Sequence, residues 1–404
     1  MILGRLSMLK MRSIALLLGF ALVGWVGWYT YSYFFDATIP SLLITGIEQD
    51  TYYCGDIACC VASDKCGELS VWLDGTPLVS NFSVRSKNQE YPFTVPTKTI
   101  SNGKHDLKIE FIDNTYHKNK KSLDRSFLVD NIPLQAAFVR TENDYKVLQG
   151  RTLHLQFQVN KEVKEAKVHA LSQDYECFPE SKNSPIYECF IPISCEETPN
   201  EYLLTVELKD RVGNELHLEN RFQVVMFPFK KQFLQVSQDK LEEERRLADD
   251  MSSLEELLAN LAKQSPREKL WRGNFCAPID IAKITCEYGT VRTTKEKGRY
   301  IHRALDVINM PKSVVWATQD GVVVVKTRYA NSGNTVVIDH GWGVLSLFFH
   351  LDSFANINVG QKIAKGNPIG TLGKTGYATG YHLHWEMRIN NIPVDPLQWT
   401  KQNF

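Results

Sequence analysis

Residues 376–396 read GYATGYHLHWEMRINNIPVDP, and within them His382 and His384 stand two positions apart. Successive side chains of a strand point to opposite faces, so the two imidazoles share one face while Leu383 and Trp385 take the other. A strand would hold both rings side by side on a rigid element. The stretch therefore predicts a half-buried strand whose histidines form either an exposed pair on a polar face or part of a site.

Three more side chains with ligand or acid–base chemistry lie upstream in the same glycine-rich region. IHRALDV (301–307) supplies His302 and Asp306, and FFHLD (348–352) supplies His350. Zinc prefers four nitrogen, sulfur or oxygen ligands, and catalytic sites leave one position to water. Two imidazoles and one carboxylate fit that description. Each motif alone has an ordinary interpretation as a surface histidine near a loop, but their joint occurrence in one small β domain favours a zinc site.

Three motifs of this region follow one another in the order HRALD (302–306), LFFHLD (347–352) and HLHWE (382–386). They resemble the HxGxD, Y-x-HL and HLH elements of lysostaphin-type (LytM-like) zinc metallopeptidases, a family of peptidoglycan endopeptidases. The similarity also includes DGVVVV, VVIDHGWG and VGQKIAKGNPIGTLGKTG, and it covers about 130 residues. It implies an antiparallel β metallopeptidase domain over 270–404.

The resemblance implies a role for each of the five side chains. His302, Asp306 and His384 correspond to the ligands of a Zn²⁺ ion, and His350 and His382 correspond to the catalytic histidines beside it. A zinc-bound water can have its pKa lowered to about 7, and an imidazole with an unperturbed pKa of about 6.5 can accept its proton. The sequence leaves open which catalytic histidine is the base and which stabilises the oxyanion.

Two positions depart from the family pattern. The glycine of HxGxD is Ala304, and if that glycine has positive φ, a methyl group there costs about 1 kcal/mol or shifts the loop. The tyrosine of the second element is Phe348, which keeps the ring and loses the hydroxyl. Neither change removes a ligand, so we expect activity. Glu386 shares the face of the two histidines, where it either orients a ligand or stays solvated, and His340 is expected to have a hydrogen-bonded structural role.

The N-terminal sequence predicts a membrane anchor. Residues 13–35 carry no charge, and a bilayer core of about 30 Å takes about 20 helical residues. Arg5, Lys10 and Arg12 precede this run, so residues 1–12 are expected to form a cytoplasmic tail. A cleavable signal peptide is the competing interpretation. The prediction is a single-pass protein of the bacterial cytoplasmic (inner) membrane, with its C-terminal bulk outside the cytoplasm.

The nine cysteines fall in clusters, and in an exported region short spacings favour disulfide bonds. Cys276 and Cys286, at the start of the last domain, are candidates for one such bond. A metal site is the alternative for the first cluster, although no CxxC pair stands there. An odd number leaves at least one thiol free or paired between chains.

Short strands and turns fill the sequence between 36 and 228. HDLKIEFID (105–113) alternates apolar and polar residues, and EYLLTVELKDRVGN (201–214) repeats the pattern about 95 residues later. Two related units of this size predict two β-sandwich domains, at 36–133 and 134–228. They resemble bacterial immunoglobulin-like domains, which most often act as spacers.

Residues 229–269 predict a helical linker. An apolar stripe recurs at alternating spacings of four and three, which places it on one helix face. The stripe either packs on a neighbouring domain or forms a short coiled-coil homodimer, and only about two heptads are present, which favours packing. The stripe consists of Leu247, Met251, Leu254, Leu258 and Leu261.

The overall charge excludes one class of partner. The 404 residues include 46 Lys and Arg and 46 Asp and Glu, and this balance does not indicate the basic surface that a nucleic-acid partner needs. The leading hypothesis is a membrane-anchored zinc metalloendopeptidase that hydrolyses peptide crosslinks of bacterial peptidoglycan. The alternatives are a non-catalytic regulator that activates a separate cell-wall hydrolase, and an adhesive protein that acts through its sandwich domains.

Overall fold

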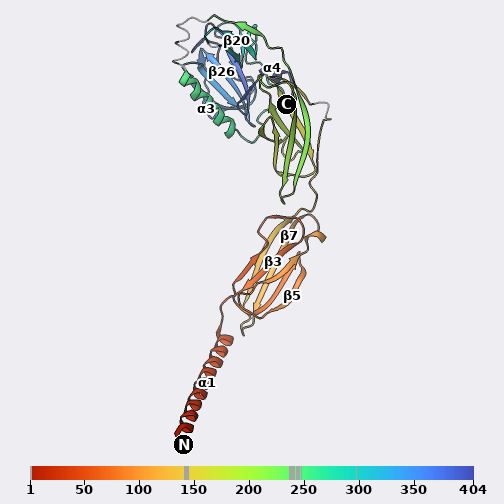
Figure 1. The fold of residues 1–404 in the computed structure, drawn as a ribbon, viewed down its shortest axis with the longest axis vertical. Helices are drawn as coiled ribbons and strands as arrows, with labels where there is room; N and C mark the ends of the chain where they lie inside the picture. The colour runs from red at the N-terminus through yellow and green to blue at the C-terminus, as the bar shows by residue number, and fades with distance from the viewer. Residues whose placement is uncertain (1, 141–144, 236–241, 243–245, 247, 297) are drawn as a thin grey trace. The chain divides into compact units, whose positions relative to one another are not determined.

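A computed structural model describes residues 2–140, 145–235, 242, 246, 248–296 and 298–404, and for residues 2–15 and 248–251 it describes the backbone alone. The fold is mainly β, as the sequence predicts (Figure 1). The chain divides into two compact units, Met1–Pro133 and Leu134–Phe404. The second unit contains all five predicted site residues, so it is the unit that concerns function most.

The first unit begins with a long helix, α1 (Ile2–Phe35), which contacts the following domain where the backbone N–H of Tyr116 donates to the carbonyl of Tyr33 at 2.9 Å. In the part of the chain that the structure describes, no helix is both long enough and apolar enough to cross a membrane. The anchor predicted over 13–35 is therefore not confirmed, and the side chains of residues 13–15 lie outside the described set.

Two sheets enclose the core of the first unit. Alternation along one strand shows why, because Leu107, Ile109 and Phe111 are fully buried while their polar neighbours are more exposed. A short 3-10 helix, Thr97–Thr99, joins two of the strands. The sheets have the orders β1 (Leu42–Thr45), β3 (Ile57–Ser63), β6 (Tyr91–Val95), and β2 (Tyr52–Tyr53), β8 (Lys120–Val129), β7 (Gly103–Asp113), β4 (Gly67–Leu73), β5 (Thr76–Val84).

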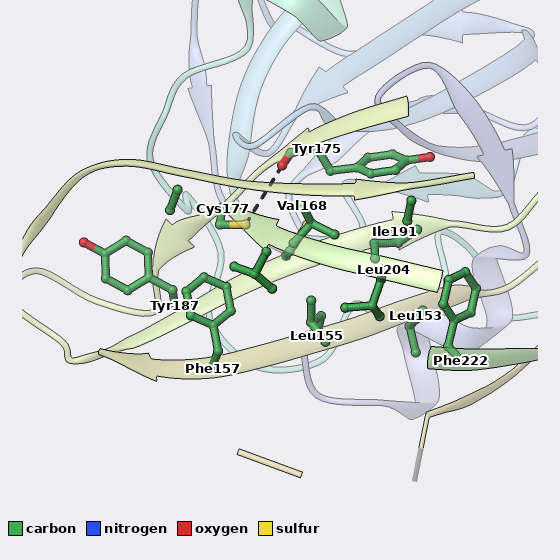
Figure 2. Close-up of a cluster of buried hydrophobic side chains, with 14 of the residues drawn as sticks. Leu153, Leu155, Phe157, Val168, Tyr175, Cys177, Tyr187, Ile191, Leu204 and Phe222 are labelled. Carbon is green, nitrogen blue, oxygen red and sulfur yellow. Dashed lines mark hydrogen bonds between the residues drawn. The ribbon is translucent and has the colours of Figure 1, made fainter. Parts of the chain in front are cut away.

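The second unit opens with another pair of sheets around a common core, which Figure 2 shows with side chains such as Leu155, Phe157 and Leu204. The sheets have the orders β10 (Lys146–Leu148), β17 (Glu215–Val225), β16 (Glu201–Asp210), β12 (Val163–Ala170), β13 (Gln173–Glu176), and β14 (Phe178–Pro179), β15 (Ile186–Pro192), β11 (Thr152–Val159), β9 (Ala136–Phe138). We call this region the second sandwich. The immunoglobulin-like assignment of both regions stays a prediction.

A large antiparallel sheet dominates the C-terminal region. Its order is β19 (Lys283–Cys286), β22 (Leu305–Ile308), β30 (Leu383–Ile389), β26 (Val344–Leu351), β25 (Gly333–Asp339), β24 (Gly321–Tyr329), β28 (Lys362–Ile363), with β31 (Ile392–Val394) on β30. Two small sheets have the orders β18 (Lys231–Phe233), β20 (Thr290–Thr294), β21 (Gly298–His302), and β23 (Val314–Trp316), β29 (Pro368–Thr371), β27 (Ser353–Phe354).

Both faces of the large sheet are covered, so every residue of β25 and β26 is buried. One face packs on the core that contains Leu383 and Trp385. The other face packs against α3 (Ala248–Gln264), which lies beside β26 (Figure 1). Fully burying an aliphatic side chain contributes about 1.5–3 kcal/mol, so this helix is an integral part of the domain.

The described part of the linker's apolar stripe packs against the large sheet of the same chain. Leu254 and Leu258 are buried against the large sheet, and Leu261 is partly buried there. Leu247 and Met251 lie outside the described side chains. The described part of the stripe thus packs on the adjacent domain, and the predicted homodimer through the linker is not supported, because these leucines already have intramolecular partners.

An aromatic cluster joins the second sandwich to the C-terminal region. The indole N–H of Trp399 donates to Thr152 Oγ1 at 3.1 Å, and the side chain of Gln398 bonds both backbone groups of Thr152. Both contacts come from α4 (Pro396–Lys401), whose first turn is capped by the side chain of Asp395. The sandwich and the sheet therefore share one core, built around Phe190, Trp271, Trp342, Trp399 and Phe404.

The structure does not support the disulfide prediction. All nine cysteines are free thiols. Cys276 Sγ contacts the carbonyl of Ala317 at 3.6 Å, whereas Cys286 lies at the end of β19 near two predicted ligands, so the two sulfurs face different surroundings. Cys59, Cys177 and Cys189 are core side chains of the two sandwiches. Cys177 and Cys189 contact each other in one core as free thiols, a role that cysteine can fill as a small apolar residue.

Candidate metal centre

Strand pairing brings distant residues to one row across the large sheet. Cys286 of β19 lies opposite Asp306 of β22, and Asp306 lies opposite His384 of β30. Directly opposed residues of antiparallel strands project their side chains to the same face. The row therefore places a thiol, a carboxylate and an imidazole side by side, although they are separated by up to 98 positions in the sequence.

Asp306 is the centre of this row. Its Oδ1 lies 3.0 Å from His384 Nδ1, and its Oδ2 lies 3.1 Å from Nε2 of His302, the last residue of β21. The two imidazole rings are 5.1 Å apart. Burial alone would raise the pKa of Asp306, but the two histidines hold this pKa well below its usual value. The carboxylate is therefore ionised and shared between two potential ligands.

His384 has a carboxylate on each ring nitrogen. Nδ1 faces Asp306, and Nε2 donates to Glu386 Oε1 at 3.0 Å. Burial opposes protonation, but the two carboxylates outweigh it and raise the pKa of His384 to about 9. The ring is a cation when no metal is bound, and a metal at Nδ1 would replace the proton there while Nε2–H stays on Glu386.

The donor set fits a divalent cation. His302 is more than nine-tenths buried, and its Nε2 has no hydrogen-bond partner despite lying close to the Asp306 carboxylate. The ligand atoms of Cys286, His302 and Asp306 all lie within 4.8 Å of one another. Nitrogen, oxygen and sulfur donors of this kind suit zinc. An orphaned buried nitrogen beside an ionised carboxylate is what a metal ion would satisfy.

His350 and His382 form a second pair beside this cluster. Their ring centres are 4.8 Å apart, and the ring of His350 lies 5.9 Å from that of His384. His350 Nδ1 donates to the carbonyl of Thr375 and His382 Nδ1 donates to that of Gly380, both at 2.9 Å. A carbonyl only accepts, so each neutral ring carries its proton on Nδ1 and leaves Nε2 with a free lone pair.

The backbone of His350 is unusual. It has a φ of 63°, a left-handed conformation that a residue with a Cβ rarely adopts. Its amide N–H bonds the carbonyl of Ser332 at 2.9 Å, which holds the chain in this conformation. Such strain collects at functional sites. Burial, helped by the positive charge of His384, lowers the pKa of His350 to about 3, which keeps its ring neutral.

A chain of hydrogen-bonded charged side chains extends from His384 to α3. Glu386 Oε2 accepts from Arg388 Nε at 2.8 Å, and the guanidinium of Arg388 is held by both oxygens of Glu255, at 2.6 and 2.7 Å. Burial would raise the pKa of Glu386, but Arg388 and His384 lower it to about 2. Glu255 lies on α3. The linker helix is therefore connected through three side chains to a candidate ligand, and Glu386 is bonded as an orienting group, not solvated.

The two departures from the family pattern cause no visible strain. Ala304 is fully buried and is not among the residues with positive φ, so its methyl group carries no left-handed penalty. Phe348 is buried in the core of the large sheet. His340 is also fully buried, with Nδ1 donating to the carbonyl of Asp320 at 2.7 Å and Nε2 lying 2.6 Å from Ser346 Oγ. That bonding is structural, and burial lowers the pKa of His340 to about 4.

The structure thus brings together all five residues predicted from the sequence, and it adds three that the sequence analysis did not place. Cys286 was assigned to a disulfide, although its position opposite Asp306 could have been proposed from pairing its short strand with HRALD. Thr375 acts through its backbone carbonyl, which leaves no side-chain signal. Glu255 belongs to a charged helix in which nothing distinguishes it from its neighbours.

A large cleft of the second unit lies away from this cluster. It has a volume of about 860 Å³ and lies where the second sandwich meets the C-terminal region, with Arg267, Lys269 and Trp342 in its lining. None of the five histidine and aspartate side chains lines it. Because the convergent polar groups are elsewhere, we identify the site by its donor atoms and not by the size of a cleft.

Comparison with known proteins agrees with this geometry. Residues 300–396 match the model of peptidase family M23, and this part of the chain is an M23 peptidase domain. DD-carboxypeptidase/endopeptidase Mpg of Neisseria meningitidis is 39% identical over 97 residues, which are 24% of this chain and 22% of that protein. Peptidoglycan DD-endopeptidase ShyB of Vibrio cholerae is 33% identical over 124 residues, 30% of this chain and 29% of that protein. The match spans less than a third of these relatives.

Two solved structures are similar to parts of this chain. A Pseudomonas aeruginosa structure described as an M23 peptidase is 21% identical, covers 63% of this chain and 94% of its own, and has a TM-score of 0.43. The catalytic domain of lysostaphin from Staphylococcus simulans is 24% identical, covers 36% of this chain and 98% of its own, and has a TM-score of 0.24.

Proposed function

We propose that the C-terminal domain, residues 270–404, is a zinc metalloendopeptidase that hydrolyses peptide crosslinks of bacterial peptidoglycan. The observation that carries the proposal is the division of the site: a carboxylate-bonded cluster suited to a cation stands beside two histidines whose Nδ1 atoms are bonded to backbone carbonyls. The relatives named above are DD-carboxypeptidases or peptidoglycan DD-endopeptidases, which supports DD-type crosslinks as the substrate.

His302, Asp306 and His384 would hold the zinc ion. When bound, zinc supplies Lewis-acid chemistry, because it lowers the pKa of a coordinated water to about 7 and polarises a carbonyl. Asp306 contributes one negative charge that partly neutralises the cation. Glu386 keeps the ring of His384 in the orientation that directs Nδ1 toward Asp306, which fixes the ligand geometry before the metal arrives.

His350 and His382 would handle the proton and the developing charge. One ring can accept a proton at Nε2 from the attacking water and later return it to the leaving amine. The other, once it has taken a proton from solvent at Nε2, can donate a hydrogen bond to the oxyanion of the peptide carbonyl. The carbonyls of Thr375 and Gly380 keep Nδ1–H in place on both rings during this exchange.

We also propose that α1 attaches the protein to the bacterial cytoplasmic membrane as a single-pass anchor, with the C-terminal bulk outside the cytoplasm. The support is the uncharged run at 13–35 and the exposed apolar side chains along its described part, which include Leu18, Phe20 and Trp25. The full chain is expected in the membrane fraction and resistant to alkaline extraction. A full chain that is released by alkaline wash contradicts the anchor.

The enzymatic proposal is tested with the purified full chain on cross-linked peptidoglycan fragments of known structure. We expect mass spectrometry to show the crosslinked dimer converted to monomers. His350→Ala should slow conversion by about 10²–10⁴-fold, while the matched control His169→Ala, at an exposed histidine of β12, should retain the wild-type rate. A folded, zinc-loaded protein that converts none of the fragments contradicts the proposal. Stimulation of a separate hydrolase that survives His302→Ala would instead support the regulator.

A further inference from the structure

Cys286 has no role in the mechanism proposed above. It ends β19 and faces the same side of the sheet as Asp306, its partner across the strands. Its side chain is buried, with Sγ 3.8 Å from the carbonyl of Glu287 and in hydrogen-bonding contact with Thr290 and Arg292. A buried thiol is usually a small apolar core residue. This one instead lies among polar groups.

The surroundings of Cys286 are those of a metal ligand. Its sulfur lies within 4.8 Å of a ligand atom of His302 and of Asp306. Nε2 of the buried His302, which lies 3.1 Å from Asp306, makes no hydrogen bond of good geometry, so it has a lone pair for a metal ion or a proton that a metal ion could replace. Thiolate sulfur is among the donors that zinc prefers.

Charge balance favours a second anion at this point. A zinc ion held by Asp306 and two neutral imidazoles leaves one positive charge in a buried place. Arg292 adds another, with Nη2 3.7 Å from Asp306 Oδ2. A thiolate at Cys286 would neutralise the metal cluster, and burying a neutral cluster costs less than burying a charged one.

We propose that Cys286 is a fourth protein ligand of the metal ion, so that the resting site is closed by a thiolate and has to open before a substrate is attacked. This inference rests on the proposed zinc site. On binding, the Cys286 thiol gives its proton to solvent and a sulfur–zinc bond forms in the position otherwise left to water. On opening, that bond breaks, the sulfur takes a proton back from solvent, and water enters.

The test uses the full chain, stripped of metal and reloaded with one equivalent of Co²⁺, whose bond to a thiolate gives intense near-ultraviolet charge-transfer absorption. We expect this absorption in the wild type and in Cys276→Ser, and its loss in Cys286→Ser. We also expect X-ray absorption of the zinc-loaded wild type to show a sulfur neighbour at about 2.3 Å. This second measurement needs no variant, so it stands even if Cys286→Ser folds poorly.

Three results separate this inference from the function on which it rests. Binding of one metal ion with sulfur absorption that depends on Cys286 supports it, and zinc affinity should then fall at least about tenfold in Cys286→Ser. Binding of one metal ion without sulfur coordination overturns the role of Cys286 and leaves the proposed enzyme intact. A wild type that binds no metal overturns both.

Discussion

The two histidines of the HLH motif lie two residues apart, yet they have different partners. His384 belongs to a carboxylate half of the site, with His302 and Asp306, where imidazole nitrogens face ionised oxygens. His382 belongs to a carbonyl half, with His350, where each ring donates Nδ1–H to a backbone oxygen. A carboxylate favours a cation, whether proton or metal, whereas a carbonyl only fixes which ring nitrogen donates. The partner of each ring, not its residue type, therefore decides its role.

The pKa directions express the same difference. Carboxylate bonding raises the pKa of His384 to about 9 against the effect of burial, whereas burial lowers the pKa of His350 to about 3. The side chain of His384 is 17% exposed and His350 is buried, and burial opposes the protonated form of both rings. The contrast in pKa therefore comes from the neighbouring groups. A substitution in one half of the site should leave the contacts of the other half in place.

Loss of a ligand should have the largest effect. In His384→Ala the carboxylate half loses its central ring, so we expect the protein to lose bound zinc and all measurable hydrolysis of cross-linked peptides. Metal analysis after gel filtration together with product analysis measures both. Retention of one tightly bound zinc ion in this variant would show that His384 is not a ligand. It would contradict the assignment of metal binding to the carboxylate half.

Loss of a carbonyl-half ring should spare the metal. We expect His350→Ala to bind one zinc ion like the wild type while its kcat falls by about 10²–10⁴-fold, the usual contribution of general acid–base catalysis. Parallel metal analysis and steady-state kinetics give the two numbers. If zinc is lost along with activity, the two halves are not separable.

A carboxylate–histidine pair outside the site serves as a control. Glu188 Oε1 lies 2.9 Å from His154 Nε2, and Lys269 lies 3.0 Å from its other oxygen. Despite burial, these partners lower the pKa of Glu188 from 4.5 to about 2. The stabilisation should be complete above pH 4.5 and should disappear as pH falls toward 2, with a total on the order of 3 kcal/mol.

Chemical unfolding of the wild type and Glu188→Gln at several pH values measures this contribution. The two proteins should differ most near neutral pH and converge at about pH 2. A difference that grows on acidification would mean that the pair stabilises the protein in its protonated form, which would weaken the same argument for Asp306 and His384.

The group behind the ligand should have a moderate effect. Glu386→Gln keeps the shape of the side chain and removes the charge that holds His384 Nε2–H, so zinc affinity should fall by about 10–100-fold. Competition with a chelator measures the affinity, and Glu255→Gln, one step further along the same chain of charged side chains, should have a smaller effect. Equal affinities in Glu386→Gln and the wild type would contradict an orienting role.

Restoring the family glycine should have the smallest effect. Because Ala304 does not have positive φ, Ala304→Gly relieves no strain and should destabilise the protein by less than about 1 kcal/mol, with unchanged turnover. Thermal unfolding and kinetics test this. A large gain in turnover would show that the alanine limits the site in the wild type.

Sequence reasoning could predict that five candidate residues lie together, because they stand in short motifs whose order matches a family pattern. The alternation along 105–113 and 201–214 likewise predicted buried positions that the structure bears out, such as Leu107 and Leu204. These features depend on the number of residues between neighbouring positions in the chain, which is the same before and after folding.

Long-range pairing was beyond the sequence. The thiol of Cys286 seemed to suit Cys276, ten residues away, because nothing in the spacing showed that β19 pairs with β22. The second sandwich was expected to be a spacer, yet Thr152 and Phe190 are built into the C-terminal core. Glu255 reaches the site only through Arg388, a contact across 133 positions. Such partners become visible only once the strands are assembled.

The central claim is that hydrolysis depends on one metal ion held by the carboxylate half. The most direct test is the turnover of a cross-linked peptide by chelator-stripped full-length protein as zinc is added. We predict that turnover rises from zero and reaches its plateau at one zinc ion per chain. Full turnover by the stripped protein, or none at one equivalent of bound zinc, would contradict the account.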